Sequence, residues 1–187
     1  MTNKIEETAN PGPLGLIGFG LATILLNLHN AGLFGLDTMV LAMGIFMGGI
    51  VQILVGMLEF KKNNMFGMIA FTSYGAFWLT LVVLILLPQL GLGTAPSPIA
   101  MGWYLTVWGL FSLGLYVATF SMNFAMKLLF ATVVALFALL AIADFTGIHL
   151  IKTIAGIEGV FCGGLAVYIA MAQLFKETFG RDVLPLG

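Results

Sequence analysis

Long hydrophobic runs, each about the length of a membrane-spanning helix, recur along the chain. A bilayer core about 30 Å thick takes roughly 20 apolar residues in a helix, and runs of this length alternate with short segments rich in charge, Pro, Gly or Asn. A helix satisfies its backbone hydrogen bonds internally in hydrocarbon, which an open strand cannot do. The pattern predicts an all-α integral membrane protein. Its six predicted spans cover residues 14–34, 38–58, 66–88, 99–120, 124–143 and 150–174.

The composition supports a membrane solvent and excludes several classes of function. Of the 187 residues, 60% are hydrophobic and 8% are charged, whereas a soluble domain carries roughly 25% charged residues. A net charge of −1 provides no basic surface for nucleic acid. The single cysteine, Cys162, excludes an internal disulfide and a multi-thiolate metal site. We therefore expect lipid around the protein, no nucleic-acid partner, and no metal or cofactor.

Basic residues are distributed unevenly between the two sides that six spans define. Both termini share one side with the second and fourth loops, and only Lys152 falls on the opposite side. The positive-inside rule then places both termini in the cytoplasm. The side with the termini carries Lys4, Lys61, Lys62, Lys127, Lys176 and Arg181.

The whole chain reads as one domain of a multi-pass protein of the inner or plasma membrane. The first hydrophobic run is longer than the roughly 7–15 residues of a signal-peptide core and follows two acidic residues, so we expect it to stay attached. A single six-helix membrane domain over 1–187 is expected, with short cytoplasmic tails at about 1–9 and 176–187.

Small residues form stripes in two of the predicted spans. Gly44, Gly48, Gln52 and Gly56 follow at intervals of four in the second span, and a similar Gly-rich stripe occurs around Gly159 in the sixth. Such stripes let neighbouring helices approach closely. Close packing within the bundle, or between copies of the chain, is the main expectation, and a direct role in solute passage is the alternative.

Polar side chains within the spans mark candidate positions for a solute path, since each must find a partner or face water. Phe19, Thr23 and Asn27 align on one face of the first span. Their alternative role is ordinary bonding between helices at the membrane interface. Glu158 lies more than one turn inside the sixth span. We consider a proton-relay role for it, against simple access to water at the outer interface.

The sequence contains no recognisable catalytic motif. It has no G-x-S-x-G, no H-E-x-x-H, no phosphate-binding loop and no pair of carboxylates within one span. The protein is therefore not expected to be an enzyme.

Motifs at both ends of the chain resemble the acetate uptake transporter family, the succinate/acetate permeases. The run from Asn10 to Leu16 reads N-P-G-P-L-G-L, where the family signature is N-P-A-P-L-G-L, and residues 180–187 read G-R-D-V-L-P-L-G. The stretches L-L-N-L-H-N at 25–30, F-T-S-Y-G at 71–75 and L-F-A-L-L-A-I at 136–142 are also similar to the bacterial permeases. The resemblance covers nearly the whole chain.

This resemblance implies a six-helix protomer with its own solute path, a fold similar to the proton-gated urea channels, and assembly as a homohexamer. It implies a hydrophobic constriction formed by Phe19, Tyr74 and Val133, where the bacterial permeases usually have Leu at the third position. Ala166 matches a further position along the path. Other candidates for lining the path are Asn10, Leu16, Thr23, Asn27, Gln52 and Thr72.

The expected function is transport of acetate and related small carboxylates, such as succinate and lactate. An apolar constriction accommodates a methyl group and disfavours an ionised carboxylate, so uptake is expected to be coupled to protons. The Tyr74 hydroxyl is a candidate donor to the passing carboxylate, and Asn10 a candidate cap that leaves free amides at the start of the first helix. The alternatives are a passive channel for acetate, acetic acid or another small solute, and a non-transporting membrane scaffold.

Overall fold

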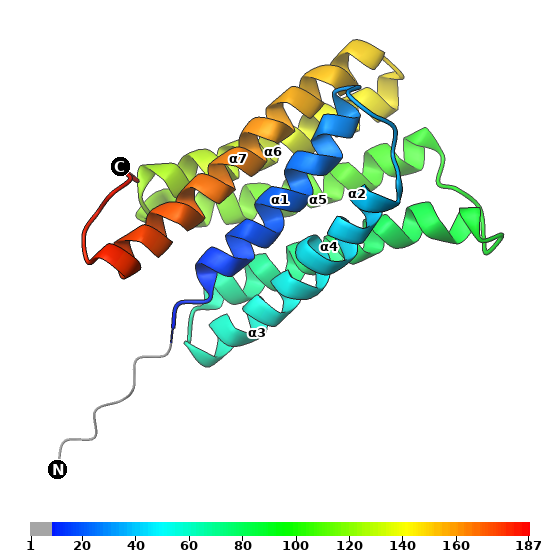
Figure 1. Ribbon diagram of the computed structural model, residues 1–187. Helices are drawn as coiled ribbons and strands as arrows, with labels where there is room; N and C mark the ends of the chain where they lie inside the picture. Colours follow the sequence, from blue (N-terminus) through cyan, green and yellow to red (C-terminus); the bar gives the residue numbers. More distant parts are fainter. Residues whose placement is uncertain (1–8) are drawn as a thin grey trace.

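The computed structural model describes residues 9–187, and all the regular structure in that range is helical. Six of its helical segments are long and apolar enough to cross a membrane, as the hydrophobic runs predicted. The helices, labelled in Figure 1, are α1 (Gly12–Asn30), α2 (Thr38–Met43), the π-helical stretch η1 (Gly44–Val51), α3 (Gln52–Lys61), α4 (Met65–Gln89), α5 (Pro98–Ala118), the 3-10 turn η2 (Thr119–Ser121), α6 (Phe124–Thr146) and α7 (His149–Phe179).

Local side-chain chemistry sets most of the helix ends. Four helices begin after a residue whose side chain accepts a hydrogen bond from a first-turn amide, which is the usual N-cap arrangement. These residues are Asp37, Asn64, Ser97 and Asn123. Gly147 and Gly180 end α6 and α7 with a φ of 67°, a left-handed conformation that glycine adopts at little cost.

The second span, α2–η1–α3, is not the regular helix that the glycine stripe assumed. Gly44 and Gly48 pack against the Trp78 ring of α4, and Gly56 packs against Thr72 of the same helix. The stem of Gln52 instead lies beside Gly18 of α1. A π-helical stretch has more residues per turn than an α-helix, so residues four apart across it no longer share one face.

The most extensive helix contact joins the first and last spans, α1 and α7, which lie side by side in Figure 1. Its glycines bring the two backbones together, as expected for small residues. A Cβ on Gly163 would lie 2.7 Å from the Gly20 carbonyl oxygen, and one on Gly159 would overlap the Asn27 side chain. The expected close packing in the sixth span is therefore packing within one protomer.

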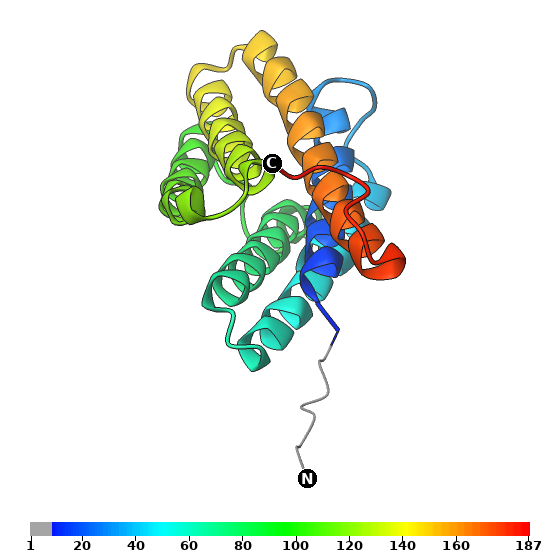
Figure 2. The ribbon, with the colours of Figure 1, turned by 90° about the vertical axis from the view of Figure 1, so that its left-hand side faces the viewer.

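The remaining helices form two pairs around this contact. Helix α3 packs on α4 and helix α5 on α6, while α4 and α5 touch each other little. Figure 2 shows the two pairs as separate groups, with α1 and α7 alongside them. This arrangement leaves the space between the pairs to be filled by side chains of α1, α4 and α6.

The C-terminal segment differs from the expected free tail at 176–187. Helix α7 continues to Phe179, and the residues after it fold back along the bundle. The Ala125 amide donates to the Leu186 carbonyl oxygen at 2.9 Å, and the Tyr168 hydroxyl donates to that of Pro185 at 2.8 Å. These hydrogen bonds hold the segment against α6 and α7. Most of the expected tail at 1–9 lies outside the described residues.

Candidate functional site

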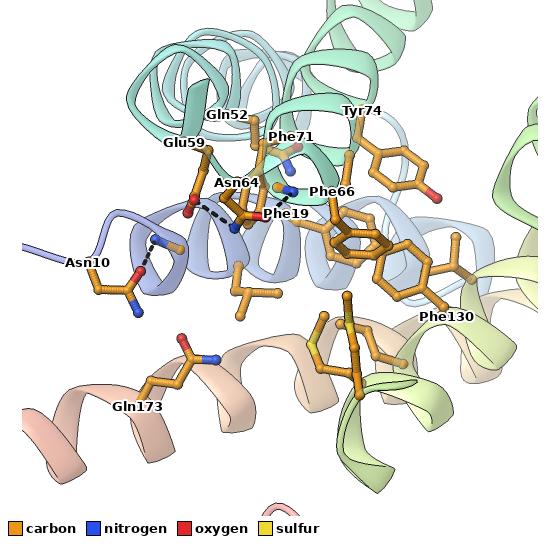
Figure 3. A pocket seen from close by; sticks show the side chains of 18 of the residues that line it. Asn10, Phe19, Gln52, Glu59, Asn64, Phe66, Phe71, Tyr74, Phe130 and Gln173 are labelled. Atoms are coloured by element: carbon orange, nitrogen blue, oxygen red, sulfur yellow. Dashed lines mark hydrogen bonds between the residues drawn. The ribbon is translucent and has the colours of Figure 1, made fainter. Parts of the chain in front are cut away.

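A cavity of about 360 Å³ opens at the end of the bundle where the described chain begins and ends. Its rim is formed by the start of α1, the α3–α4 turn, the turn before α6 and the last part of α7. Figure 3 shows side chains from these separate elements converging on it. The lining residues are Asn10, Gly12, Leu16, Phe19, Gln52, Glu59, Asn64, Phe66, Gly67, Ala70, Phe71, Tyr74, Met122, Asn123, Met126, Leu129, Phe130, Val133 and Gln173.

A second, smaller cavity of about 30 Å³ lies deeper in the bundle, enough for about one water molecule. Phe19, Tyr74 and Val133 line both cavities, and no other residue does. The three residues implied by the family resemblance to form a constriction are therefore the ones shared by the two cavities. The small cavity is lined by Phe19, Thr23, Leu26, Asn27, Tyr74, Phe77, Trp78, Val133, Leu136, Phe137 and Leu140.

The three shared side chains come from three helices and pack closely. The ring centroids of Phe19 and Tyr74 are 5.8 Å apart, and Val133 is only 2% exposed. The Tyr74 ring also contacts Trp108, Phe111 and Phe130, with centroids 6.0 to 6.4 Å away. This aromatic cluster fixes the position of the ring at the point where the cavities meet.

The Tyr74 hydroxyl is engaged elsewhere, which argues against the expected hydrogen bond to a passing carboxylate. It donates to Ser112 Oγ of α5 at 2.9 Å, and the Ser112 hydroxyl donates in turn to the Trp108 carbonyl oxygen at 2.8 Å. Ser112 is fully buried. The hydroxyl proton therefore points into the protein, and the ring itself is the part of Tyr74 that lines the cavities.

The start of α1 also differs from the expectation of free amides. Asn10 does bind the first turn, since its Oδ1 accepts from the Gly12 amide at 3.1 Å. The Leu14 and Gly15 amides donate to the Pro11 carbonyl oxygen, and Pro13 has no amide hydrogen. The early amides are thus paired or absent, and what this end offers the cavity is the Asn10 side chain.

Buried polar atoms without a hydrogen-bond partner in the described chain occur beside both cavities. Gln52, which lines the large cavity and is 1% exposed, has neither its carbonyl oxygen nor its amide nitrogen paired. On the small cavity, the Thr23 hydroxyl and the Trp78 indole nitrogen are likewise unpaired. Because an unpaired buried polar group is unfavourable, these atoms are candidates to bind water or solute.

Glu59 is a cavity residue that the sequence reasoning missed. Its position next to Lys61 and Lys62, at the end of a span, suggested a solvated loop. In the structure it is 3% exposed, and its Oε2 accepts a hydrogen bond from Asn64 Nδ2 at 2.8 Å (Figure 3). Glycine at 12 and 67 lets α1 and α4 close over it. It is the one charged residue on the described lining of the large cavity.

The remaining predicted path residues separate into two groups. Asn10, Leu16 and Gln52 line the large cavity, and Thr23 and Asn27 line the small one. Thr72 and Ala166 line neither, because Thr72 packs on Gly56 and Ala166 is fully buried. Both assignments to the path lining are corrected for this structure.

Glu158, the predicted proton site, also lies outside the lining of both cavities. Its two carboxylate oxygens are buried and have no hydrogen-bond partner among residues 9–187. A further group that the sequence did not reveal is the aromatic wall of the large cavity, formed by Phe66, Phe71 and Phe130. Phe residues in apolar spans carry no signal that separates cavity lining from lipid contact.

Comparison with known proteins shows close relatives over almost the whole chain. It is 53% identical over 181 residues to a succinate-acetate/proton symporter, SatP, from Escherichia coli K12, covering 97% of this chain and 96% of that protein. It is 37% identical over 178 residues to the ammonia transport outward protein 2 of Saccharomyces cerevisiae, covering 91% of this chain and 63% of that one. Both names describe transport rather than catalysis.

A solved structure described as the bacterial acetate channel SatP matches with a TM-score of 0.95 and 52% sequence identity. The match covers 97% of this chain and 100% of that one, and it agrees with the six-helix fold. The family resemblance drawn from the end motifs is also confirmed, because a family model matches residues 1–181. The chain therefore belongs to the GPR1/FUN34/yaaH family, as a multi-pass membrane protein.

Proposed function

We propose that this protein transports acetate and related small carboxylates, succinate among them, across the membrane. The path runs from the large cavity, past Phe19, Tyr74 and Val133, into the small cavity. The observation that carries the proposal is that these three residues alone line both cavities. The names of the symporter and of the acetate channel support the substrate class.

The apolar ring between the cavities makes proton coupling the favoured mode. An ionised carboxylate loses hydration there without a compensating charge, which is strongly unfavourable. An anion entering the cell alone is also opposed by about 2.3 kcal/mol per 100 mV of membrane potential. Movement together with a proton removes both costs. A passive channel for acetate or acetic acid is the alternative, and both words occur in the names of relatives.

The large cavity faces the cytoplasm in this proposal, in an inner or plasma membrane with both termini inside. Its end of the bundle carries five basic residues of the described chain, whereas the opposite end carries only Lys152, in agreement with the positive-inside rule. Lys4, which the sequence assigned to the same side, lies outside the described residues. The five are Lys61, Lys62, Lys127, Lys176 and Arg181.

We further propose that the protein forms a homohexamer. Large apolar side chains such as Trp103, Val107 and Leu110 are more than 60% exposed on α5, and Gly114 of the same helix has open space where a side chain would project. Small and apolar faces of this kind suit contact with another membrane helix as well as with lipid. Mass measurement of the detergent-solubilised protein tests the number of copies.

Glu158 keeps its proposed role as a proton site, now placed outside the lining of the path. A carboxylate with no partner in a membrane helix is costly when ionised, which favours proton binding. Replacing Glu158 with Gln should change how uptake depends on pH. An unchanged pH dependence would remove this role.

Uptake into liposomes tests the main proposal. Labelled acetate is measured in vesicles with wild-type protein, with Tyr74→Ala and without protein, each with and without an inward proton gradient. Gradient-driven accumulation beyond the pH-dependent trapping of the neutral acid, altered by Tyr74→Ala, supports a coupled transporter. Dissipative uptake supports the channel, and uptake no greater than in empty vesicles favours the scaffold.

A further inference from the structure

Gln52 presents a complete, unpaired carboxamide at the inner part of the large cavity. The residue begins α3 directly after the π-helical stretch, and its stem packs beside Gly18 of α1. It lines the cavity together with Phe19 and Tyr74, two of the three residues shared with the small cavity (Figure 3). Both its amide nitrogen and its carbonyl oxygen are buried without a partner in the described chain. Such a group calls for a ligand that supplies both a donor and an acceptor.

The cavity lining provides no charge that would favour an anion at this position. No Lys, Arg or His side chain belongs to the lining as described, and its one charged residue is the acidic Glu59. A carboxylate is an acceptor only, so it can pair with the Gln52 amide hydrogen but then brings its second oxygen toward the Gln52 carbonyl oxygen. An ionised solute therefore satisfies half of this group and meets repulsion at the other half.

A neutral carboxylic acid matches the same group completely. Its hydroxyl donates to the Gln52 carbonyl oxygen while its own carbonyl accepts from the Gln52 amide nitrogen, forming a closed pair of hydrogen bonds. We propose that Gln52 binds the protonated acid, not the carboxylate, immediately before the apolar ring. This inference rests on the proposed transport function and names the species that the path accepts. No bond to hydrogen is broken at Gln52, since the solute carries its proton with it.

Acetamide is the probe that follows from this chemistry. It has the same number of heavy atoms as acetic acid and presents a donor beside an acceptor, but it does not lose a proton near neutral pH. Acetone has the same size and only an acceptor. We expect acetamide to compete with labelled acetate for uptake in wild-type proteoliposomes and acetone to compete far less. At fixed total acetate, uptake should follow the neutral acid, which falls about tenfold per pH unit above its pKa.

Gln52→Met removes both hydrogen bonds and keeps the length of the side chain. The loss of two neutral hydrogen bonds should weaken inhibition by acetamide about thirtyfold. Gln52→Glu should retain the preference for acetamide over acetone at acidic pH, where a protonated carboxyl still offers a donor and an acceptor, and lose it at alkaline pH. Thr72→Val is the matched control, since it also removes an unpaired buried polar atom, but one that lines neither cavity.

Binding measured without transport separates this proposal from the transport function. In detergent, acetamide should raise the unfolding temperature of wild type and Thr72→Val, and not that of Gln52→Met. Equal effects of acetamide and acetone on the wild type would overturn the proposal, as would an undiminished acetamide effect in Gln52→Met. If acetamide binds as expected while vesicles show no acetate uptake, the transport function fails and the Gln52 site stands.

Discussion

Replacing Tyr74 with Phe separates the ring of this residue from its hydroxyl. The hydroxyl donates to Ser112 Oγ at 2.9 Å, on the side toward α5, while the ring lines both cavities. Phe keeps the ring and its contacts with Phe19 and Phe130. The lining of the path should therefore be unchanged, and we expect acetate uptake to stay within about twofold of wild type because the loss is one hydrogen bond away from the path.

The cost in stability follows from the same geometry. Ser112 keeps its own hydrogen bond to the Trp108 carbonyl oxygen at 2.8 Å in Tyr74→Phe, so only one favourable bond is lost. That costs about 0.6–1 kcal/mol. Ser112→Ala is different, because it leaves the buried Tyr74 hydroxyl without its acceptor. Its expected cost is about 1–3 kcal/mol. The serine variant should thus be the less stable of the two.

Thermal unfolding in detergent and initial acetate uptake in vesicles measure the two quantities on the same preparations. For a chain of this size, about 1 kcal/mol corresponds to roughly 2–4 °C in the unfolding temperature. Tyr74→Ala provides the contrast, since loss of the ring removes about 3–5 kcal/mol of packing and opens the boundary between the cavities. If Tyr74→Phe abolished uptake at near wild-type stability, the hydroxyl would be acting on the solute and the reasoning would be wrong.

Three further substitutions test other parts of the structure. Val133→Leu should narrow the path and lower lactate uptake more than acetate uptake, and an equal proportional change in both would contradict the constriction assignment. Gly163→Ala should destabilise by about 1–3 kcal/mol in thermal unfolding, since its Cβ would meet the Gly20 carbonyl oxygen, whereas Gly164→Ala, with open space around it, should stay within about 0.5 kcal/mol. Glu59→Gln should raise the uptake rate more at alkaline than at acidic pH, because it removes a negative charge from the cavity lining and keeps the acceptor for Asn64; a pH-independent effect would refute this.

The spans could be predicted from the sequence because hydrophobicity and helix caps are local properties. The run of apolar residues and a cap such as Asn64 or Asn123 together define where a helix begins. The glycines of the sixth span likewise pointed to close packing, although the sequence did not show that the partner was α1.

The site depended on contacts between distant segments, and there the sequence was less informative. Ser112, which takes the Tyr74 hydroxyl, lies 38 residues away and is one of several serines and threonines in the spans. Glu59 is buried only because glycines of α1 and α4 close over it. The π-helical stretch has no sequence signature, and it moved Gln52 off the glycine face.

The close contact between α1 and α7 has a consequence for how the protein is made. The two helices that share the largest contact are the first and the last to leave the ribosome. Until α7 is inserted, Asn27 of α1 lacks the glycine surface that covers it, and a polar amide of this kind in lipid is unfavourable. Chains that stop before α7 should therefore be recognised as unfinished by membrane quality control, with Asn27 as the exposed mark.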